Sequence, residues 1–421
     1  MNPIALIDAN NFYCSCERVF NPKLTGKPVI VLSNNDGMPI SRSEEAKAVG
    51  IDMAKPIFEL KDIIKKYNVQ VFSSNYTLYS DLSKRMMETI RQFSPDVEEY
   101  SIDEAFVSLQ GFGNKNLTEY GREIKETVYQ WTGIPVSIGI APTKTMAKIA
   151  SKIAKKSIKA KGVLDLTDPR YQEIALKRFE VADIWKCGPA RFRLLKSHGI
   201  HTAWDLRNVA LEWVDKRLGV EGTRMVKELR GEPCIPLELT KQPKKRIGCG
   251  RSFGTRVESL KEIKECLASH IADAAARLRQ DHQVAGAMNI YLQTNPYSKG
   301  PQYNNGIIVE LPIATDETGE FIRWATKAVE QIYKPGYVYK RVHVDFDQLG
   351  SNREIQQNLF VKKDRDRQVQ LMGALDKVNQ VFGTGRLRYL AEGIDKAWKT
   401  RFEFRSLRYT TRWDELLTVH A

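Results

Sequence analysis

The stretch PIALIDANNF, residues 3–12, gives the first indication of the fold. Its apolar run from Ile4 predicts a short buried strand that ends at Asp8. Asn10 or Asn11 can cap a helix that begins directly afterwards, because asparagine side chains accept hydrogen bonds from the free N–H groups of a first helical turn. We therefore expect a carboxylate at the end of a core strand.

The next 150 residues extend this strand into a mixed domain. Apolar residues recur at helical spacing over residues 79–93 and 117–131, and the β-rich run VEEYSIDEAFVSL (97–109) lies between them. A strand at 136–141, a lysine-rich helix from about Thr143 and a strand near 162–166 follow. The order β, α, β, β, α, β predicts a sheet with antiparallel central strands and helices on one face. Residues 18–74 would form an insertion.

The rest of the chain divides at a polar linker. Residues 167–235 have a helical pattern with short loops, and Lys241–Arg246 has no apolar period. Residues 248–346 again have the order β, α, β, β, α, β, which predicts a second α+β domain. Further on, 13 basic and 6 acidic residues lie between Val361 and Arg412, with few apolar positions among them. The expected fold class is therefore α+β, with several domains.

Composition and charge narrow the function. The 421 residues include 65 Lys and Arg and 51 Asp and Glu, for a net charge of +14. Residues 1–110 alone have a net charge of −3, so the basic excess lies in the later parts, as expected for a chain that binds a polyanion.

No apolar run approaches the roughly 20 residues of a membrane helix, and the first residues do not have the pattern of a secretory signal. Six scattered cysteines without CxxC spacing argue against a disulfide scaffold or a thiolate zinc site. We expect a cytoplasmic protein without a membrane partner.

A second acidic pair, Asp103–Glu104, lies where two β-rich runs meet. It can form a cluster with Asp8, since neighbouring strands are only about 4.8 Å apart. Clustered carboxylates repel one another unless cations lie between them, and two Mg²⁺ ions can align an attacking hydroxyl, a phosphorus and a leaving pyrophosphate. Neighbours on a strand point to opposite faces, so this pair can share one site only at a turn or bulge, or through the longer glutamate. A solvated hairpin tip is the alternative.

Two motifs, DANNFYCSCE (8–17) and YSIDEAF (100–106), resemble the paired catalytic motifs of Y-family, lesion-bypass DNA polymerases. Five further segments resemble the UmuC-type catalytic subunit of DNA polymerase V: KPVIVLSNNDG (27–37), VFSSNYTLYSDLS (71–83), GIAPTKTMAKIASKIAKK (139–156), ELRGEPC (228–234) and SLRYTTRWDEL (406–416). The resemblance follows the chain in order over almost its whole length.

This resemblance implies a right-hand polymerase fold, which agrees with the order of elements given above. The implied parts are a ferredoxin-like palm at 1–17 and 75–166, small fingers at 18–74, a helical thumb at 167–235, a linker at 236–246, a βαββαβ little finger at 247–350, and a C-terminal extension with a clamp-binding peptide and a basic tail at 351–421.

The resemblance also implies catalytic roles for single residues. Asp8, Asp103 and Glu104 match the metal-binding carboxylates, with the Ala9 carbonyl as a further ligand, so two Mg²⁺ ions are the implied cofactors. Tyr13 matches the steric gate, a ring that collides with a ribose 2′-hydroxyl; a core aromatic on the first helix is the plainer interpretation.

Basic residues match the nucleotide-binding positions of the family. Lys47 and Lys155 match the cations that hold the dNTP triphosphate, where ammonium groups stabilise charge that shifts to the pyrophosphate. Ile40 and Arg42 lie where the fingers would cover the nascent base pair. Four lysines form one helical stripe, for which a solvated face is the alternative: Lys144, Lys148, Lys152 and Lys155.

Several positions depart from the family pattern. Asn10 replaces a second aspartate and is not expected to bind metal, and Met38-Pro39 differs from the usual pair in the fingers. Glu44 stands where many relatives have a tyrosine that contacts the triphosphate, so we expect its carboxylate to point away from the phosphates. Lys186 replaces the first glycine of a helix-hairpin-helix turn, which would alter that phosphate-binding turn or add a cation to it.

Two further regions are expected to bind partners. Primer–template DNA would be held through its phosphates, with candidate contacts at Lys186, Arg246, Arg251, Arg256, Lys340 and Arg341. The segment Ile355–Phe360 resembles the Q-x-x-L-F peptide that binds the sliding clamp, with Gln356, Leu359 and Phe360 as its anchors. By resemblance, the basic tail would contact a UmuD′-type dimer and a RecA filament.

We therefore predict error-prone translesion DNA synthesis, in which a primer 3′-hydroxyl attacks a dNTP, without proofreading. The resemblance places this activity in SOS mutagenesis at the nucleoid. A self-sufficient polymerase IV type is the alternative within the family, and the long C-terminal extension argues against it. A nucleotide cyclase would not need a DNA-binding domain, and a non-catalytic assembly factor on DNA would be expected to lack a carboxylate or Tyr13.

Overall fold

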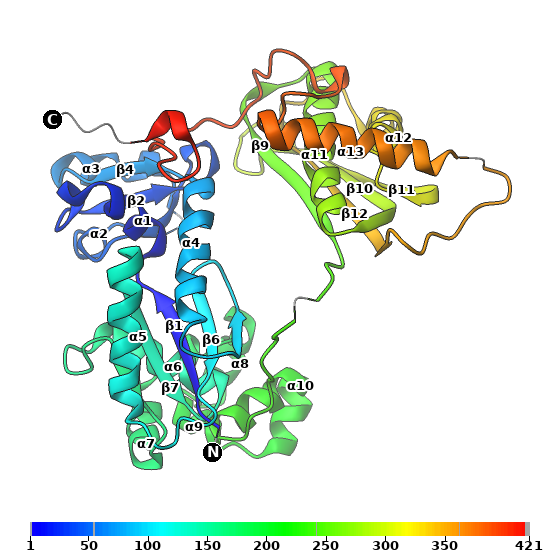
Figure 1. The fold of residues 1–421 in the computed structure, drawn as a ribbon. Helices are drawn as coiled ribbons and strands as arrows, with labels where there is room; N and C mark the ends of the chain where they lie inside the picture. The colour runs from blue at the N-terminus through cyan, green and yellow to red at the C-terminus, as the bar shows by residue number, and fades with distance from the viewer. Residues whose placement is uncertain (1, 54, 241, 362, 417–421) are drawn as a thin grey trace. The chain divides into compact units, whose positions relative to one another are not determined.

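The computed structural model describes residues 2–53, 55–240, 242–361 and 363–416 (Figure 1). Met1, Ala54, Lys241, Lys362 and residues 417–421, which fall in the expected palm, fingers, linker and C-terminal extension, lie outside the described residues. The chain forms two compact units. The first comprises residues 1–33, 38–241 and 404–421, and the second comprises residues 34–37 and 242–403.

A five-stranded sheet forms the centre of the first unit, in the order β5-β6-β1-β7-β8. Its strands are β1 (Ile4–Ala9), β5 (Val97–Glu99), β6 (Glu104–Ser108), β7 (Val136–Ala141) and β8 (Val163–Asp165). The central strand β1 pairs antiparallel with both β6 and β7, whereas β7 and β8 are parallel. The predicted order of strands and helices, with its antiparallel centre, is confirmed.

The helices of this sheet lie on both faces, and the expectation of a single covered face is wrong. Helices α4 (Tyr76–Ile90) and α5 (Leu117–Thr132) pack with Ile7 on one side of β1. Helix α6 (Lys144–Lys156) packs with Leu6 on the other side. Gly139 on β7 permits this approach, because a Cβ there would lie 2.1 Å from the backbone nitrogen of Ser151 on α6.

The insertion after α1 (Phe12–Phe20) contains a small sheet in the order β3-β2-β4. Its strands are β2 (Val29–Leu32), β3 (Pro39–Arg42) and β4 (Gln70–Ser73), with the short helices α2 (Glu44–Ala48) and α3 (Lys61–Lys66) beside them. The residues of β2 are completely buried, which explains their uninterrupted apolar run VIVL.

Four helices follow the palm-like sheet: α7 (Pro169–Arg178), α8 (Pro189–Ser197), α9 (Ala203–Arg207) and α10 (Leu211–Leu229). Their apolar side chains share one core with the α6 face of the sheet. Lys144 of the predicted lysine stripe is buried in this region, where its ammonium group pairs with Glu98 and donates to the Pro236 carbonyl. Its role is structural, and the solvated-face alternative is wrong for this residue.

The second unit contains a four-stranded antiparallel sheet in the order β11-β10-β12-β9 (Figure 1). The elements are β9 (Ile247–Val257), α11 (Leu260–Gln280), β10 (Gln283–Thr294), β11 (Asn304–Thr315), α12 (Thr318–Ile332) and β12 (Tyr339–Ser351), as the sequence predicts. The two helices and the sheet bury a common apolar core that includes Phe321 stacked on Phe346.

The described residues of the C-terminal extension, up to Leu416, are divided between the two units. Helix α13 (Arg365–Phe382) is bound to the second unit by ion pairs: Arg279–Asp376, Arg365–Asp316 and, just before the helix, Lys363–Glu320. Residues 404–416 then belong to the first unit. Several basic residues of the extension are therefore neutralised within the chain.

Two global features complete the description. All six cysteines are free. Across the described ranges, no helix has both the length and the apolar character needed to cross a membrane.

Candidate active site

Asp8 and Glu104 lie directly opposite each other on the paired strands β1 and β6. Both side chains point to the face that α6 covers, because Leu6 and Phe106, which pair two residues further along the same strands, are buried in the core beneath α6. Like charges placed opposite each other across a strand pair destabilise a sheet. This arrangement costs folding free energy, so its presence points to function.

Asp103 lies in the bend that precedes β6, and this resolves the problem of neighbouring residues on a strand. Its carbonyl accepts a hydrogen bond from the Ala9 N–H at 2.9 Å, and its carboxylate accepts one from the Ser101 hydroxyl at 2.6 Å. The negative charges of Glu104 and Asp103 both contribute to raising the pKa of Asp8. The paired strands therefore bring Asp8 and Glu104 together at one end of the sheet, and Asp103 lies near enough for its charge to act on Asp8.

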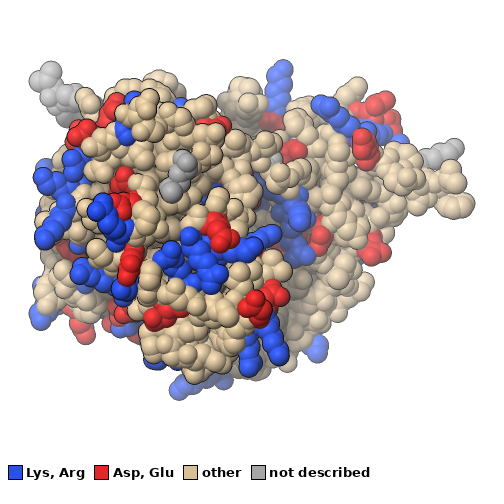
Figure 2. All heavy atoms as spheres, turned by 90° about the horizontal axis from the view of Figure 1, so that it is seen from below, with Lys and Arg blue, Asp and Glu red and all other residues tan. Residues whose placement is uncertain are grey.

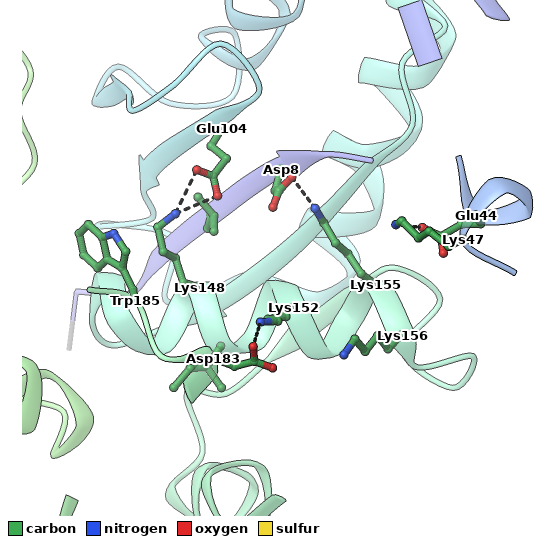
Figure 3. A pocket seen from close by; sticks show the side chains of 12 residues that line it. Asp8, Glu44, Lys47, Glu104, Lys148, Lys152, Lys155, Lys156, Asp183 and Trp185 are labelled. Carbon is green, nitrogen blue, oxygen red and sulfur yellow. Dashed lines mark hydrogen bonds and ion pairs between the residues drawn. The ribbon is translucent and has the colours of Figure 1, made fainter. Parts of the chain in front are cut away.

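The lysines of α6 supply counter-charges for two of these carboxylates (Figure 3). Lys155 Nζ lies 2.5 Å from Asp8 Oδ1, and Lys148 Nζ lies 2.8 and 3.0 Å from the two oxygens of Glu104. Lys152 is paired instead with Asp183, at 2.6 Å.

Burial raises the pKa of Asp8 to about 6, although the ammonium group of Lys155 acts against this shift. A carboxylate with a raised pKa in a cavity is a candidate functional group, because the surrounding protein does not fully compensate its charge. A cation bound beside Asp8 would supply the missing compensation.

The carboxylate oxygens of this site suit Mg²⁺, provided that a substrate supplies the remaining ligands. Within residues 2–53, 55–240, 242–361 and 363–416, no group of three or more His, Cys, Asp or Glu side chains is placed so that it could hold a metal ion. Mg²⁺ is usually held by only one or two carboxylates together with substrate phosphates, and its ligands are oxygens. Asp8 and Glu104 provide such oxygens, both now bound to ammonium groups.

A cavity of about 720 Å³ opens over these residues. It is lined by charged side chains from α2, α6 and the strand ends: Asp8, Glu44, Lys47, Glu104, Lys148, Lys152, Lys155, Lys156 and Asp183, together with Leu6, Ile149 and Trp185. Five of these residues are lysines, which is the charge that a triphosphate requires.

Lys47 reaches this cavity from helix α2, and Glu44 accompanies it. The ammonium group of Lys47 donates to Glu44 Oε1 at 2.5 Å and to Asn11 Oδ1 at 2.8 Å. Burial acts to raise the pKa of Glu44, but hydrogen bonds from Lys47 and Asn11 lower it overall. The expectation that Glu44 points away is wrong, because it is the partner that holds Lys47 at the cavity.

Ile40 and Arg42, both on β3, do not line the cavity. The Arg42 guanidinium donates to the Ile51 carbonyl and lies 3.9 Å from Asp52, within the fingers-like insertion. Ile40 packs against the core of the first unit. The structure thus gives these two residues local partners and does not bring them together with the carboxylates.

Tyr13 lies on α1, next to the carboxylate cluster. Its ring stacks on Tyr79 of α4 with centroids 4.6 Å apart and planes at 20°, and it meets the edge of Tyr76 at 6.0 Å. Burial raises the pKa of Tyr13 to about 12, and the charge of Asp103 adds to this shift. The phenol is therefore neutral, held by other aromatic rings, and close to the charge of Asp103.

Aromatic rings that the sequence did not predict surround the ammonium group of Lys148. Its ammonium group lies 4.4 Å from the ring centroid of Tyr100 and 5.4 Å from that of Trp185, and the Trp185 indole N–H donates to the Tyr100 hydroxyl at 3.1 Å. The only signals were the lysine spacing of α6 and the position of Tyr100 in YSIDEAF. Nothing in the sequence linked Trp185 to either.

The turn around Lys186 keeps a glycine-like backbone conformation, although lysine replaces the first glycine of the helix-hairpin-helix motif there. Lys186 adopts φ 67°, in the left-handed region that the replaced glycine would favour. Its carbonyl accepts a hydrogen bond from Arg191 at 2.9 Å, and its ammonium group pairs with Glu221 at 2.8 Å. The turn geometry is compatible with a phosphate-binding loop before α8.

The remaining DNA-contact candidates lie on β9 and β12 or just before them. Arg246 pairs with Asp347 at 2.5 Å, Lys340 donates to the Phe253 carbonyl at 3.4 Å, and Arg341 contacts His343 at 3.1 Å. Arg251 and Arg256 are exposed on β9. Figure 2 shows one face of the molecule on which Lys and Arg side chains gather in groups with Asp and Glu between them.

The clamp-peptide candidates are open to solvent. Leu359 and Phe360 are 95% and 94% exposed, which is unusual for large apolar side chains in a soluble fold. The Asn358 side chain accepts a hydrogen bond from the Phe360 N–H at 2.9 Å, and the Gln356 side chain donates to the Gln357 carbonyl at 3.2 Å. Among the described residues, both apolar side chains of the segment are thus left almost fully open to solvent.

Comparison with known proteins gives consistent matches along the chain. The impB/mucB/samB family matches residues 7–152, the C-terminal domain of that family matches residues 244–359, and a domain of unknown function (DUF4113) matches residues 369–419. Protein UmuC of Salmonella typhimurium is 41% identical over 99% of both chains, and Protein MucB of Escherichia coli is 35% identical over 97% of both. A DNA polymerase IV of Desulfatibacillum aliphaticivorans is 29% identical over 94% of this chain and 98% of its own.

Solved structures support the same fold. A Y-family DNA polymerase chimera of Dbh and Dpo4 matches with a TM-score of 0.69 and 20% identity, over 83% of this chain and 100% of its own. DinB from Sulfolobus solfataricus matches with a TM-score of 0.52, over 82% of this chain and 98% of its own. The predicted family and fold are confirmed. The chain belongs to the impB/mucB/samB family and is a DNA-directed DNA polymerase of the Y-family, with similarity to UmuC along its whole length.

Proposed function

We propose that this polymerase carries out error-prone synthesis across damaged template by nucleotidyl transfer at Asp8, Asp103 and Glu104, without proofreading. The observation that carries the assignment is the cross-strand pair Asp8–Glu104, which faces a lysine-lined cavity although like charges in that position destabilise the sheet.

The three carboxylates and the Ala9 carbonyl would hold two Mg²⁺ ions together with the phosphates of a dNTP. When bound, such ions supply a more acidic primer 3′-hydroxyl and compensation for the charge that develops on the pyrophosphate. Asp8 is the carboxylate prepared for this role, because its pKa of about 6 leaves its charge only partly compensated before the ions bind.

Lys47 and Lys155 would bind the triphosphate from opposite walls of the cavity. Both ammonium groups are held near it by carboxylates, Lys47 by Glu44 and Lys155 by Asp8. Nucleotide binding would then exchange these ion pairs for contacts with phosphate oxygens, so that the lysines stabilise charge on the leaving group. Tyr13 would close the site beneath the sugar and exclude a 2′-hydroxyl.

A primer-extension assay on damaged and undamaged templates tests this assignment. Wild-type protein is expected to extend past the lesion, and Asp103→Ala is expected to extend neither template. Asp62→Ala, at a carboxylate outside the cavity, serves as the control that changes an exposed charge in the same unit. Extension by Asp103→Ala at the wild-type rate would overturn the assignment.

We further propose that the exposed pair Leu359–Phe360 binds a sliding clamp. Two adjacent, almost fully exposed apolar side chains on a polar segment can insert into a hydrophobic pocket as anchors. The double variant Leu359→Ala with Phe360→Ala is expected to lose stimulation of processivity by the clamp while keeping unaided insertion. Equal stimulation of the variant and the wild type would refute the proposal.

DNA binding is proposed to rest on phosphate contacts of the thumb turn at Lys186 and of the basic residues on β9 and β12. Affinity for primer–template DNA is then expected to fall steeply with salt, since each neutralised phosphate releases counter-ions. A flat salt response would contradict this.

The relation to UmuC is the basis for two further proposals. The C-terminal extension would contact a UmuD′-type dimer and a RecA filament, and the protein would be cytoplasmic and associated with the nucleoid.

A further inference from the structure

Residues Phe404–Leu416, here called the C-terminal strap, are built into the catalytic unit. The Ser73 N–H donates to the Phe404 carbonyl at 3.0 Å, and the Phe404 N–H donates to the Ser73 hydroxyl at 2.9 Å. Tyr409 stacks on Phe20 at the end of α1, with centroids 4.6 Å apart and planes at 14°. The strap therefore contacts β4 and α1, and α1 is the helix that carries Tyr13.

The strap also bonds the residue that precedes α4. The side chain of Asn75, at the N-cap position of that helix, makes no capping hydrogen bond. It donates instead to the strap, at 2.9 Å to the Ser406 hydroxyl, 3.2 Å to the Ser406 carbonyl and 3.1 Å to the Leu407 carbonyl. Asn75 is 0% exposed, so these bonds are shielded from water, which would otherwise compete for them.

Ser406 connects the strap to a buried carboxylate behind Tyr13. Its hydroxyl donates to Glu17 Oε1 at 3.0 Å, and the Tyr79 hydroxyl donates to the same oxygen at 2.6 Å. Glu17 and Tyr79 are both buried. An ionised Glu17 has only acceptors, so both hydroxyls are committed as donors, and the Ser406 oxygen remains free to accept from Asn75.

Tyr79 carries this network to Tyr13, because the two rings stack at 4.6 Å with planes at 20°. We propose that the C-terminal strap, through Ser406, Glu17 and Tyr79, positions Tyr13 and thereby sets how strictly ribonucleotides are excluded. Ser406 and Glu17 are positioning residues, since neither touches the substrate. This inference rests on the proposed role of Tyr13 at the sugar.

A small displacement of Tyr13 is enough to change the discrimination. A steric gate works by collision with one hydroxyl group, so its selectivity depends on the ring position, whereas binding of the deoxynucleotide does not. Loosening the support should therefore raise ribonucleotide insertion and leave deoxyribonucleotide insertion nearly unchanged. A general defect in folding would lower both.

The test measures kcat/KM for a ribonucleotide and for the matching deoxyribonucleotide with the full-length chain. Ser406→Ala and Tyr79→Phe, which keeps the stacked ring, are each expected to raise the ribonucleotide-to-deoxyribonucleotide ratio about 2-fold to 10-fold, the contribution of one intramolecular hydrogen bond. Two matched variants are expected to leave the ratio unchanged: Thr411→Ala in the same strap and Tyr120→Phe, whose buried hydroxyl donates to the Phe93 carbonyl.

A double-mutant cycle separates positioning from a structural effect. In a Tyr13→Ala background, Ser406→Ala is expected to have no further effect on the ratio, because the ring through which it acts is gone. If Tyr13→Ala raises the ratio but Ser406→Ala and Tyr79→Phe do not, the inference fails and the proposed gate stands. If Tyr13→Ala leaves the ratio unchanged, the gate fails and the inference with it. An equal effect of Ser406→Ala with and without Tyr13 would also overturn it.

Discussion

The two units use their acidic residues in opposite ways. In the second unit, Asp316, Glu320 and Asp376 are each paired with an arginine or lysine, and these pairs bind the C-terminal extension to the sheet and its helices. In the first unit, Asp8 and Glu104 face each other across two strands. Both regions contain partly buried ion pairs, so an ion pair alone does not identify a catalytic site.

The distinguishing feature of the catalytic unit is a buried carboxylate, Asp8, whose charge its lysine partner does not fully compensate. Burial and the neighbouring charges of Glu104 and Asp103 raise the pKa of Asp8 to about 6 even though Lys155 is in contact with it. Such a site lowers stability and is retained for function. Asp316, Glu320 and Asp376 of the second unit hold the C-terminal extension in place, whereas Asp8 of the first unit is proposed to bind a cation.

The largest expected effect comes from removing the charge of Asp8. Asp8→Asn should reduce the rate of nucleotide insertion by at least about 100-fold. Because ionisation of Asp8 is disfavoured in the folded state, the same variant should raise the free energy of unfolding at pH 7, by up to about 3 kcal/mol. Insertion kinetics and chemical denaturation of the two proteins check both effects. Asp376→Asn is the matched control, and it should lower stability and keep insertion.

Lys155 should contribute less than Asp8. Lys155→Met is expected to lower kcat/KM for the dNTP about 10-fold to 100-fold, the range for a hydrogen bond to a charged group. Lys159→Met, an exposed lysine outside the cavity, should leave it unchanged. Steady-state insertion kinetics distinguish the two variants, and equal values for both would remove Lys155 from the triphosphate site.

The second unit should be the acid-sensitive one. Burial lowers the pKa of His270 to about 3, and nearby positive charges, Arg251 first among them, act in the same direction. The unfolded chain therefore takes up a proton below about pH 6.5 that the folded chain does not, and stability is lost as the pH falls from there toward 3. The slope should approach about 1.4 kcal/mol per pH unit.

Denaturation of wild type and His270→Gln between pH 7 and pH 5 measures this slope. Glutamine can still accept the hydrogen bond that His270 takes from the Arg251 N–H at 3.3 Å, so the variant should fold and lack this part of the acid sensitivity. The same pH dependence in both proteins would show that His270 is not its source.

The smallest effect is expected at the ion pairs of α13. Arg365→Ala leaves the buried Asp316 carboxylate without its guanidinium partner and should lower the free energy of unfolding by about 1 to 2 kcal/mol. Unaided insertion should be unchanged. Urea denaturation followed by circular dichroism measures the first effect, and a fall in insertion rate would mean that α13 supports the catalytic unit directly.

Much of the fold follows from local sequence. The alternating and helical periods of residues 4–8, 79–93 and 117–131 identify β1, α4 and α5 because one face of each element is buried. The second unit repeats these signals. The apolar pattern of α6 does not show which face of the sheet this helix covers. The position of α6 depends on the space above Gly139, which lies on β7.

Sequence motifs predicted the residues of the candidate site. They did not predict the contacts that depend on strand register or on side-chain hydrogen bonds between distant segments. Asp8, Asp103 and Glu104 were found from two motifs, and the register that sets Asp8 opposite Glu104 became visible only in the sheet. The roles of Asn75 and Ser406 could not be predicted, because 331 residues separate the two partners and a side-chain hydrogen bond of that range leaves no local pattern.

Counting bound metal ions is the direct test of two-metal catalysis at Asp8, Asp103 and Glu104. Mn²⁺ can replace Mg²⁺ and be followed by electron paramagnetic resonance in a complex of the full chain, a primer with a blocked 3′ end, template and dNTP. Two-metal catalysis predicts about two bound ions per complex beyond those that DNA and dNTP retain alone, with binding strongly weakened in Asp8→Asn. Equal Mn²⁺ binding by wild type and Asp8→Asn would contradict it.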